Sequence, residues 1–203
     1  MLEKKKILRK IIKVRVSAIS ADEKAKREKL LLDNLFSMPE FLAANTVMLF
    51  ANLPDEIGTF SLIDKCIAMG KKVFLPVING DDMTVAEFTG EYRVGRYDIK
   101  EPVVKQLGVN GLTTESRDNA CIVRDSDTEP VEVSFKEHFD FILVPGVAFS
   151  PNGYRLGRGK GYYDKFLSKY TNLFTVGVCF REQFYLDIPT EPHDIPMHKV
   201  IVC

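Results

Sequence analysis

Apolar and polar residues alternate along the chain in patterns typical of successive helices and strands. Residues 2–18 place Ile7 and Ile11 on one stripe beside Leu8 and Ile12, which predicts a helix. A capping box over residues 20–23 predicts a second helix that ends before residue 39. A third helix is predicted from about residue 59 to residue 69, where a glycine follows as the C-terminal cap.

Short apolar runs between these helices predict buried strands, and a last helix is predicted over residues 161–170. The predicted strands cover residues 46–50, 72–75, 83–88, 139–144 and 173–178. Strands that alternate with helices favour an α/β fold with a mostly parallel, Rossmann-like sheet and helices on both faces.

Residues 103–137 depart from this alternation because they are polar and contain glycines. Two short β-like pieces, at 121–123 and 131–135, flank a segment that can turn a hairpin. We interpret the segment as a surface excursion from a single domain that covers residues 1–203, a length that can bury its own core.

Charge and cysteine content narrow the classes of function. The formal net charge is zero, but residues 2–16 carry seven bases and one acid, a local net charge of +6. This distribution favours one small polyanion as ligand over broad nucleic-acid binding. The four cysteines are far apart, which disfavours a zinc site and fits a reducing cytoplasm. We expect no signal peptide and no membrane span.

The most informative stretch is a glycine-rich segment between a predicted strand and a predicted helix. Glycines let backbone N–H groups approach an anion closely, and bases among them add charged hydrogen bonds, so the segment predicts a polyphosphate site. It is neither a P-loop nor a G-x-G-x-x-G motif, because its last three glycines alternate with other residues. The alternative is a flexible turn with solvated bases. The glycines and bases are Gly153, Gly157, Gly159, Gly161, Arg155, Arg158 and Lys160.

The core of this segment, Arg-Leu-Gly-Arg-Gly-Lys-Gly-Tyr-Tyr-Asp at 155–164, resembles the signature of the 5-formyltetrahydrofolate cyclo-ligase family. The resemblance extends to Lys-Lys-Ile-Leu-Arg at 5–9, Asp-Glu at 55–56, Ile-Lys-Glu-Pro at 99–102 and the acid at 194. It implies a fold like that of sugar-phosphate isomerases and CoA-transferases, preceded by two N-terminal helices. It also implies cyclisation of 5-formyltetrahydrofolate to 5,10-methenyltetrahydrofolate, with ATP converted to ADP and phosphate. The 103–137 excursion is longer than the family usually has.

The same resemblance assigns site residues for ATP, folate and Mg²⁺. It implies that Arg155 and Lys160 act in the phosphoryl transfer, and that Asp164 and Asp194 bind Mg²⁺. We expect replacing either base to weaken ATP use without harming the fold. The folate contacts implied are Ala51, Glu56, Arg158, Lys160 and Tyr162. The ATP contacts implied are Lys5, Lys6, Arg9, Arg155, Gly157, Arg158, Gly159, Lys160, Gly161, Tyr162 and Tyr163.

Each of these residues also has a purely structural interpretation. The basic N-terminal helix can be a solvated face, and Asp164 can serve only the dipole of its helix. Glu56 and Asp194 can be turn residues, while the adjacent Tyr162 and Tyr163 point about 100° apart, so that one packs inward. We assign no role to the histidines at 193 and 198.

Two other functions remain open at this point. One is an enzyme of the sugar-phosphate isomerase kind, which needs a phosphate loop and a well-placed acid such as Glu56 but no ATP. The other is a nucleotide-binding protein without catalytic activity, which needs neither Glu56 nor Asp164. For a cyclo-ligase we expect small-molecule partners, folate and ATP, and a monomer or a weak homo-oligomer, with no nucleic acid or membrane as partner.

Overall fold

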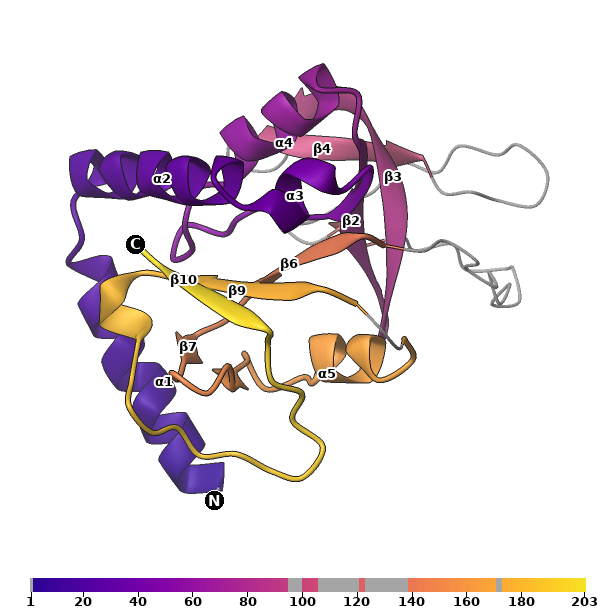
Figure 1. Cartoon of the computed structure of the whole chain (residues 1–203). Helices are drawn as coiled ribbons and strands as arrows, with labels where there is room; N and C mark the ends of the chain where they lie inside the picture. Colours follow the sequence, from indigo (N-terminus) through magenta and orange to yellow (C-terminus); the bar gives the residue numbers. More distant parts are fainter. Residues whose placement is uncertain (1, 95–99, 106–120, 123–138, 171–172) are drawn as a thin grey trace.

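The computed structural model describes residues 2–94, 100–105, 121–122, 139–170 and 173–203, and a mixed β-sheet forms its centre (Figure 1). The strand order across the sheet is β10-β9-β6-β1-β2-β3-β4, and β5 pairs with β2 beyond the end of β1. In chain order the strands are β1 (Thr46–Met48), β2 (Lys72–Asn79), β3 (Asp82–Val94), β4 (Lys100–Lys105), β5 (Cys121–Ile122), β6 (Phe141–Pro145), β9 (Thr175–Cys179) and β10 (Lys199–Val202).

The sheet is mostly parallel, as the sequence predicts. Strands β10, β9, β6, β1 and β2 are neighbours in parallel register; Val47, for example, lies opposite Val73 on one side and Phe141 on the other. Only the β2–β3–β4 edge is antiparallel. Parallel strands require crossover connections, and the helical ones place helices over the faces of the sheet.

The two faces of the sheet carry separate cores. In β6, Phe141 and Leu143 belong to one core, whereas Ile142 and Val144 belong to the other, because side chains alternate along a strand. Helix α5 covers the second face, which confirms the expectation of helices on both faces. The first face is covered by α1 (Leu2–Ser17), α2 (Ala21–Phe36), α3 (Pro39–Ala43) and α4 (Phe60–Ala68), and α5 comprises Tyr162–Leu167.

The N-terminal helix turns a different face inward from the one predicted. Ile12 and Val16 are buried, but Ile7 and Ile11 are exposed, so the stripe that the sequence suggests is only partly the buried one. The second helix begins as predicted, because the side chain of Ser20 accepts a hydrogen bond from the backbone N–H of residue 23. None of the described helices combines the length and hydrophobicity that a membrane crossing requires.

Several short elements were not predicted. Helix α3, the hairpin strands near residue 150 and β10 are each five residues or shorter, too short to show a clear period. Part of the predicted excursion belongs to the sheet, since β4 extends to residue 105 and the β-like piece at 121–122 pairs with β2. The predicted β-like piece at 131–135 lies outside the described residues.

The topology brings two distant segments together. Parallel strands β1 and β6 are neighbours, so the residues that follow their carboxyl ends leave the sheet at the same edge. The turn at 51–56 follows β1, and the glycine-rich segment follows β6. Helix α1 lies beside the chain that leads from β6 toward α5 (Figure 1).

Candidate active site

The glycine-rich segment begins with a tight hairpin. Strands β7 (Ala148–Phe149) and β8 (Arg155–Leu156) pair in antiparallel fashion, and Gly153 lies in the turn between them with a φ of 81°. A side chain at Gly153 would overlap the backbone of Met197, which also donates a hydrogen bond to the Gly153 carbonyl. Only glycine therefore allows the hairpin to contact the segment before β10 at this point.

Beyond the hairpin, the loop turns into α5 through two glycines with positive φ, Gly159 at 111° and Gly161 at 68°. Helix α5 has six residues, fewer than the ten predicted, so its dipole adds little to anion binding. Lys160 is exposed, and its Nζ lies 3.7 Å from the Asp81 carboxylate. The hydroxyl of Tyr162 donates to the Gly80 carbonyl at 3.0 Å, which ties the start of the helix to the β2–β3 turn.

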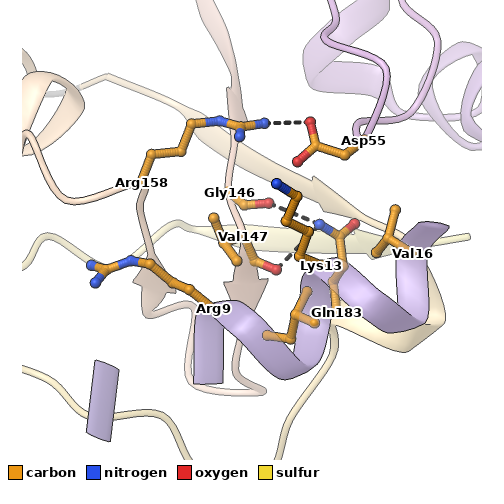
Figure 2. Close-up of a pocket in the computed structure, with 9 residues that line it drawn as sticks. Arg9, Lys13, Val16, Asp55, Gly146, Val147, Arg158 and Gln183 are labelled. Atoms are coloured by element: carbon orange, nitrogen blue, oxygen red, sulfur yellow. Dashed lines mark hydrogen bonds and ion pairs between the residues drawn. The ribbon is translucent and has the colours of Figure 1, made fainter. Parts of the chain in front are cut away.

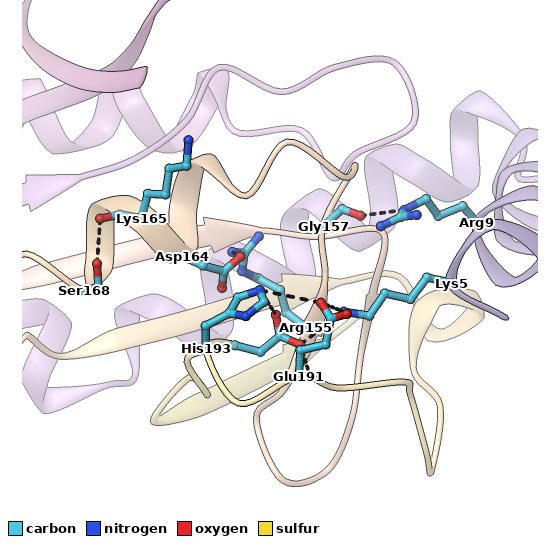
Figure 3. Close-up of polar contacts among 10 residues, drawn as sticks. Lys5, Arg9, Arg155, Gly157, Asp164, Lys165, Ser168, Glu191 and His193 are labelled. Carbon is cyan, nitrogen blue, oxygen red and sulfur yellow. Dashed lines mark hydrogen bonds and ion pairs between the residues drawn. The ribbon is translucent and has the colours of Figure 1, made fainter. Parts of the chain in front are cut away.

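Arg155 lies beneath this loop instead of facing outward from it. Its side chain is 5% exposed, and its Nη2 is 2.7 Å from Oδ2 of Asp164 (Figure 3). The guanidinium carbon lies 5.3 Å from the centre of the Tyr163 ring, and Nη1 lies close under Gly157. Nε, Nη2 and the Tyr163 hydroxyl are buried and make no hydrogen bond within the described part of the chain, so the contact with Asp164 is an ion pair without hydrogen-bond geometry.

Bases of α1 reach the loop and the segment before β10. Nε of Arg9 donates to the Gly157 carbonyl at 2.8 Å, which fixes the arginine along the loop. Lys5 is buried, with Nζ 3.0 Å from Oε2 of Glu191 and 3.3 Å from Oδ2 of Asp194. These contacts join the first helix to residues almost at the other end of the chain (Figure 3).

The segment at 191–194 gathers groups that can bind a cation. Oδ2 of Asp194 accepts the backbone N–H of Glu191 at 2.7 Å, and Nε2 of His193 lies 3.5 Å from Oε2 of Glu191. One ligand atom from each of these three residues lies within 4.8 Å of the other two. Asp164 lies outside this cluster and is held by Arg155. Sequence reasoning missed Glu191, because nothing local distinguishes it from other loop glutamates.

The turn after β1 supplies a second pair of acids. Nη2 of Arg158 lies 2.7 Å from Oδ1 of Asp55 and 3.0 Å from Oε1 of Glu56. The other Glu56 oxygen accepts the backbone N–H of Leu53 at 2.9 Å. Ala51 is half-buried at the start of the same turn. The turn and the glycine-rich segment therefore meet through Arg158, as the strand order requires.

The two acids of this turn differ in their electrostatics. Burial raises the pKa of Glu56, although the Leu53 N–H and Arg158 partly oppose this. Burial also acts to raise the pKa of Asp55, but the hydrogen bond and charge of Arg158 outweigh it, so the pKa of Asp55 is lowered. Glu56 is the more desolvated carboxylate of the two, and the more dependent on a partner that supplies hydrogen bonds.

A pocket of about 140 Å³ lies between α1 and the glycine-rich segment (Figure 2). Arg9, Lys13 and Arg158 make its surface basic, and Asp55 lies at its edge. Gln183 contributes to the lining and donates through Nε2 to the carbonyls at 146 and 147. The pocket thus places three bases beside a loop of exposed backbone, which suits an anionic ligand.

The structure brings most of the predicted site residues into two adjoining groups. Lys5, Arg9, Arg155, Asp164 and Asp194 form one group, and Glu56 with Arg158 forms the other. Lys6 and Lys160 are exposed, and within the described part of the chain Lys6 makes no hydrogen bond or ion pair with either group.

Comparisons with known proteins find one family repeatedly. A family model described as the 5-formyltetrahydrofolate cyclo-ligase family matches residues 1–203. A relative from Schizosaccharomyces pombe, named a probable 5-formyltetrahydrofolate cyclo-ligase, is 33% identical over 181 residues, which cover 81% of this chain and 78% of the relative. A 5-formyltetrahydrofolate cyclo-ligase from Mus musculus is 25% identical over 204 residues, which cover 97% and 92% of the two chains.

A solved structure supports the same relationship. The 5,10-methenyltetrahydrofolate synthetase of Aquifex aeolicus superposes with a TM-score of 0.69 at 29% identity, covering 98% of this chain and 89% of that one. Each of these similarities spans most of both chains.

Proposed function

Because the chain belongs to the 5-formyltetrahydrofolate cyclo-ligase family, we propose that it catalyses the ATP-dependent cyclisation of 5-formyltetrahydrofolate to 5,10-methenyltetrahydrofolate. The observation that carries this proposal is the convergence of two distant segments, α1 and the turn after β1, on the glycine-rich loop. Arg9 of α1 binds the loop, Arg158 of the loop binds Glu56, and Asp164 directly after the loop is held by Arg155.

The proposed reaction needs no protein nucleophile. The formyl oxygen on N5 attacks the γ-phosphorus of ATP, and ADP leaves. N10 then attacks the activated formyl carbon and loses its proton, while the former formyl oxygen departs with inorganic phosphate. The protein's tasks are to hold the two substrates in line and to neutralise charge on the transferred phosphoryl group.

The nucleotide's phosphates have a basic surface available to them. The terminal nitrogens of Arg9 lie along Gly159, and Lys160 is exposed beside the same backbone. Guanidinium groups suit phosphate because they donate hydrogen bonds in pairs. We assign phosphate contact to Arg9, Lys160 and the loop backbone. Arg155 acts from below, as a buried charge that holds Asp164 and supports Gly157.

The residues fit a magnesium ion bound together with the nucleotide. Mg²⁺ takes oxygen ligands and typically uses one or two carboxylates, completing its shell with phosphate oxygens and water. Asp164 and Asp194 would hold it. In the structure the carboxylate of Asp164 pairs with Arg155, and that of Asp194 pairs with Lys5. When bound, the ion supplies positive charge to the phosphate oxygens.

Glu56 is our choice for recognising the pterin ring. Its carboxylate is 10% exposed and is desolvated, so hydrogen bonds to it are strong and specific. The amino and ring N–H groups of a pterin are donors of the kind that such a carboxylate accepts. Cys66, Cys179 and Cys203 are buried free thiols, which agrees with a reducing compartment such as the cytoplasm.

A single assay tests the proposal. Purified protein is mixed with 5-formyltetrahydrofolate and Mg²⁺, and the absorbance of 5,10-methenyltetrahydrofolate is followed with and without ATP. We expect product only when ATP is present. Pentose phosphates tested for isomerisation provide the contrasting arm, and activity there without folate turnover would favour the isomerase-like alternative.

A further inference from the structure

A single nitrogen of Arg158 serves two carboxylates. Its Nη2 lies 2.7 Å from Oδ1 of Asp55 and 3.0 Å from Oε1 of Glu56, and both contacts are hydrogen bonds. A terminal guanidinium nitrogen carries two hydrogens, so one hydrogen is committed to each acid. The arginine thereby bridges the two acids, and Figure 2 shows its contact with Asp55 beside the pocket.

Little of the Glu56 carboxylate is left for a ligand in this arrangement. Oε2 accepts the backbone N–H of Leu53, Oε1 accepts Arg158, and only 10% of the side chain is exposed. The backbone donor is fixed by the turn. Because the side chain is nearly enclosed and the guanidinium lies against Oε1, a ligand that pairs with both oxygens of Glu56 competes with Arg158 for this position.

The arginine is the member of this group that can move. Its side chain is 46% exposed, whereas the Glu56 side chain is nearly enclosed. Arg158 also lies between Gly157 and Gly159, and the positive φ of Gly159 is a backbone conformation open to glycine at little cost. Moving the arginine breaks two hydrogen bonds but leaves the two hydrophobic cores intact.

We propose that Asp55 and Arg158 form a latch over Glu56, which must open before the pterin ring can pair with that carboxylate. The inference rests on the proposed function, because it takes the pterin as the ligand of Glu56. Asp55 is a positioning residue: it does not contact the pterin but holds the arginine in the closed position. Folate affinity then includes the cost of opening the latch.

The latch predicts that removing the charge of Asp55 strengthens folate binding. Replacing Asp55 with asparagine removes one charge from the arginine's partners and should loosen the closed state. Because Asp55 and Arg158 are both partly exposed, their pair is weak, and folate should bind about 2- to 5-fold more tightly in Asp55→Asn. A loss of charge at the edge of a binding site thus improves binding.

Equilibrium binding of 5-formyltetrahydrofolate, measured without ATP, tests the proposal in a double-mutant cycle. The proteins are wild type, Asp55→Asn, Arg158→Ala and the double variant. Asp33→Asn, which makes the same charge change at an exposed position on α2, is the matched control. Thermal unfolding of each variant checks that it is folded.

The latch predicts tighter binding in Asp55→Asn when Arg158 is present and no effect of the same change in the Arg158→Ala background. An equal improvement in both backgrounds would mean that Asp55 merely repels the anionic folate, and it would overturn the latch, as would unchanged or weaker binding in Asp55→Asn. If the wild-type protein binds no folate, the proposed function fails and the latch fails with it. If it binds folate and Asp55→Asn does not improve binding, only the latch fails.

Discussion

The two proposed sides of the site bury their ionised residues differently. On the nucleotide side both members of each pair are largely enclosed, since the exposed fractions of the side chains are 9% for Lys5 and 11% for Asp194, and 5% for Arg155 and 17% for Asp164. On the folate side the acid is enclosed and the cation is open, with Glu56 at 10% and Arg158 at 46%. The nucleotide side comprises Lys5, Arg155, Asp164, Glu191 and Asp194, and the folate side comprises Asp55, Glu56 and Arg158.

This difference indicates which partner stays when a ligand arrives. A buried charge left without its partner is costly, so the enclosed residues stay in place. On the nucleotide side both members of each pair therefore stay, and a metal ion would bind the acids while they remain beside their cations. On the folate side the fixed acid exchanges an arginine for the donors of the pterin. The comparison therefore predicts different consequences for equivalent substitutions on the two sides.

The largest effect is expected from Arg155→Ala. Removing this enclosed cation leaves Asp164 without its counter-charge and empties the space below the loop, so unfolding should be easier by about 3–5 kcal/mol. This changes the expectation from sequence that the fold would survive the substitution unharmed. Chemical denaturation measures the effect, with Lys160→Ala as the exposed control that should lie within about 0.5 kcal/mol of wild type. Equal stabilities for the two variants would contradict the buried position of Arg155.

Asp164→Asn should impair catalysis through the metal. Asparagine keeps the size and polarity of the side chain but loses the charge, so turnover should fall by at least about 10-fold at low Mg²⁺ and recover in part as Mg²⁺ is raised. Binding of folate alone should stay near the wild-type value. Turnover measured against Mg²⁺ concentration decides the point. Superimposable curves for the two proteins would mean that Asp164 only pairs with Arg155 and does not bind the metal. Asp194 would then be the next ligand to test.

Glu56→Gln should weaken folate binding without changing ATP binding. An amide replaces one acceptor with a donor, so folate affinity should fall by roughly 10-fold or more, as expected for loss of a charged hydrogen bond. ATP affinity should be unchanged, because Glu56 contacts only the folate side. Calorimetric titration with each substrate measures both values. A loss of ATP binding with folate binding intact would show that Glu56 is assigned to the wrong substrate.

The smallest effect concerns pH. Burial raises the pKa of Glu56, so between the ordinary glutamate pKa and the raised value the folded protein binds more protons than the unfolded chain. Stability from this group therefore declines as pH rises through that interval. Asp55 behaves oppositely, because its lowered pKa gives stability that is lost as pH falls.

The two acids can be compared directly by substitution. Relative to wild type, Glu56→Gln should gain stability as pH rises above the ordinary glutamate pKa, whereas Asp55→Asn should be less stable at neutral pH and approach wild type as pH falls below the ordinary aspartate pKa. We expect each difference to be less than about 1 kcal/mol. Unfolding free energies at several pH values measure both trends. Parallel trends in the two variants would contradict the opposite environments of these neighbouring acids.

Much of the fold follows from local patterns, whereas the burial of charged residues does not. Alternating strands and helices predict a parallel sheet, and the carboxyl-end rule explains why Glu56 approaches the glycine-rich segment. The burial of Arg155 could not be predicted in this way, because Arg155 lies in a two-residue strand that is too short to show a pattern. The pairing of Lys5 with Glu191 is equally hidden, since it joins residues 186 positions apart. Lys6, the residue next to Lys5 in the sequence, is also a lysine but is exposed.

Coupling between ATP use and ring closure tests the central claim most directly. ADP and 5,10-methenyltetrahydrofolate should be measured in the same reaction of the wild-type protein with 5-formyltetrahydrofolate, Mg²⁺ and limiting ATP. The account predicts equal amounts of the two products, with ring closure ending when ATP is exhausted. Methenyltetrahydrofolate formed without ATP, or ADP released with no methenyltetrahydrofolate, would contradict it.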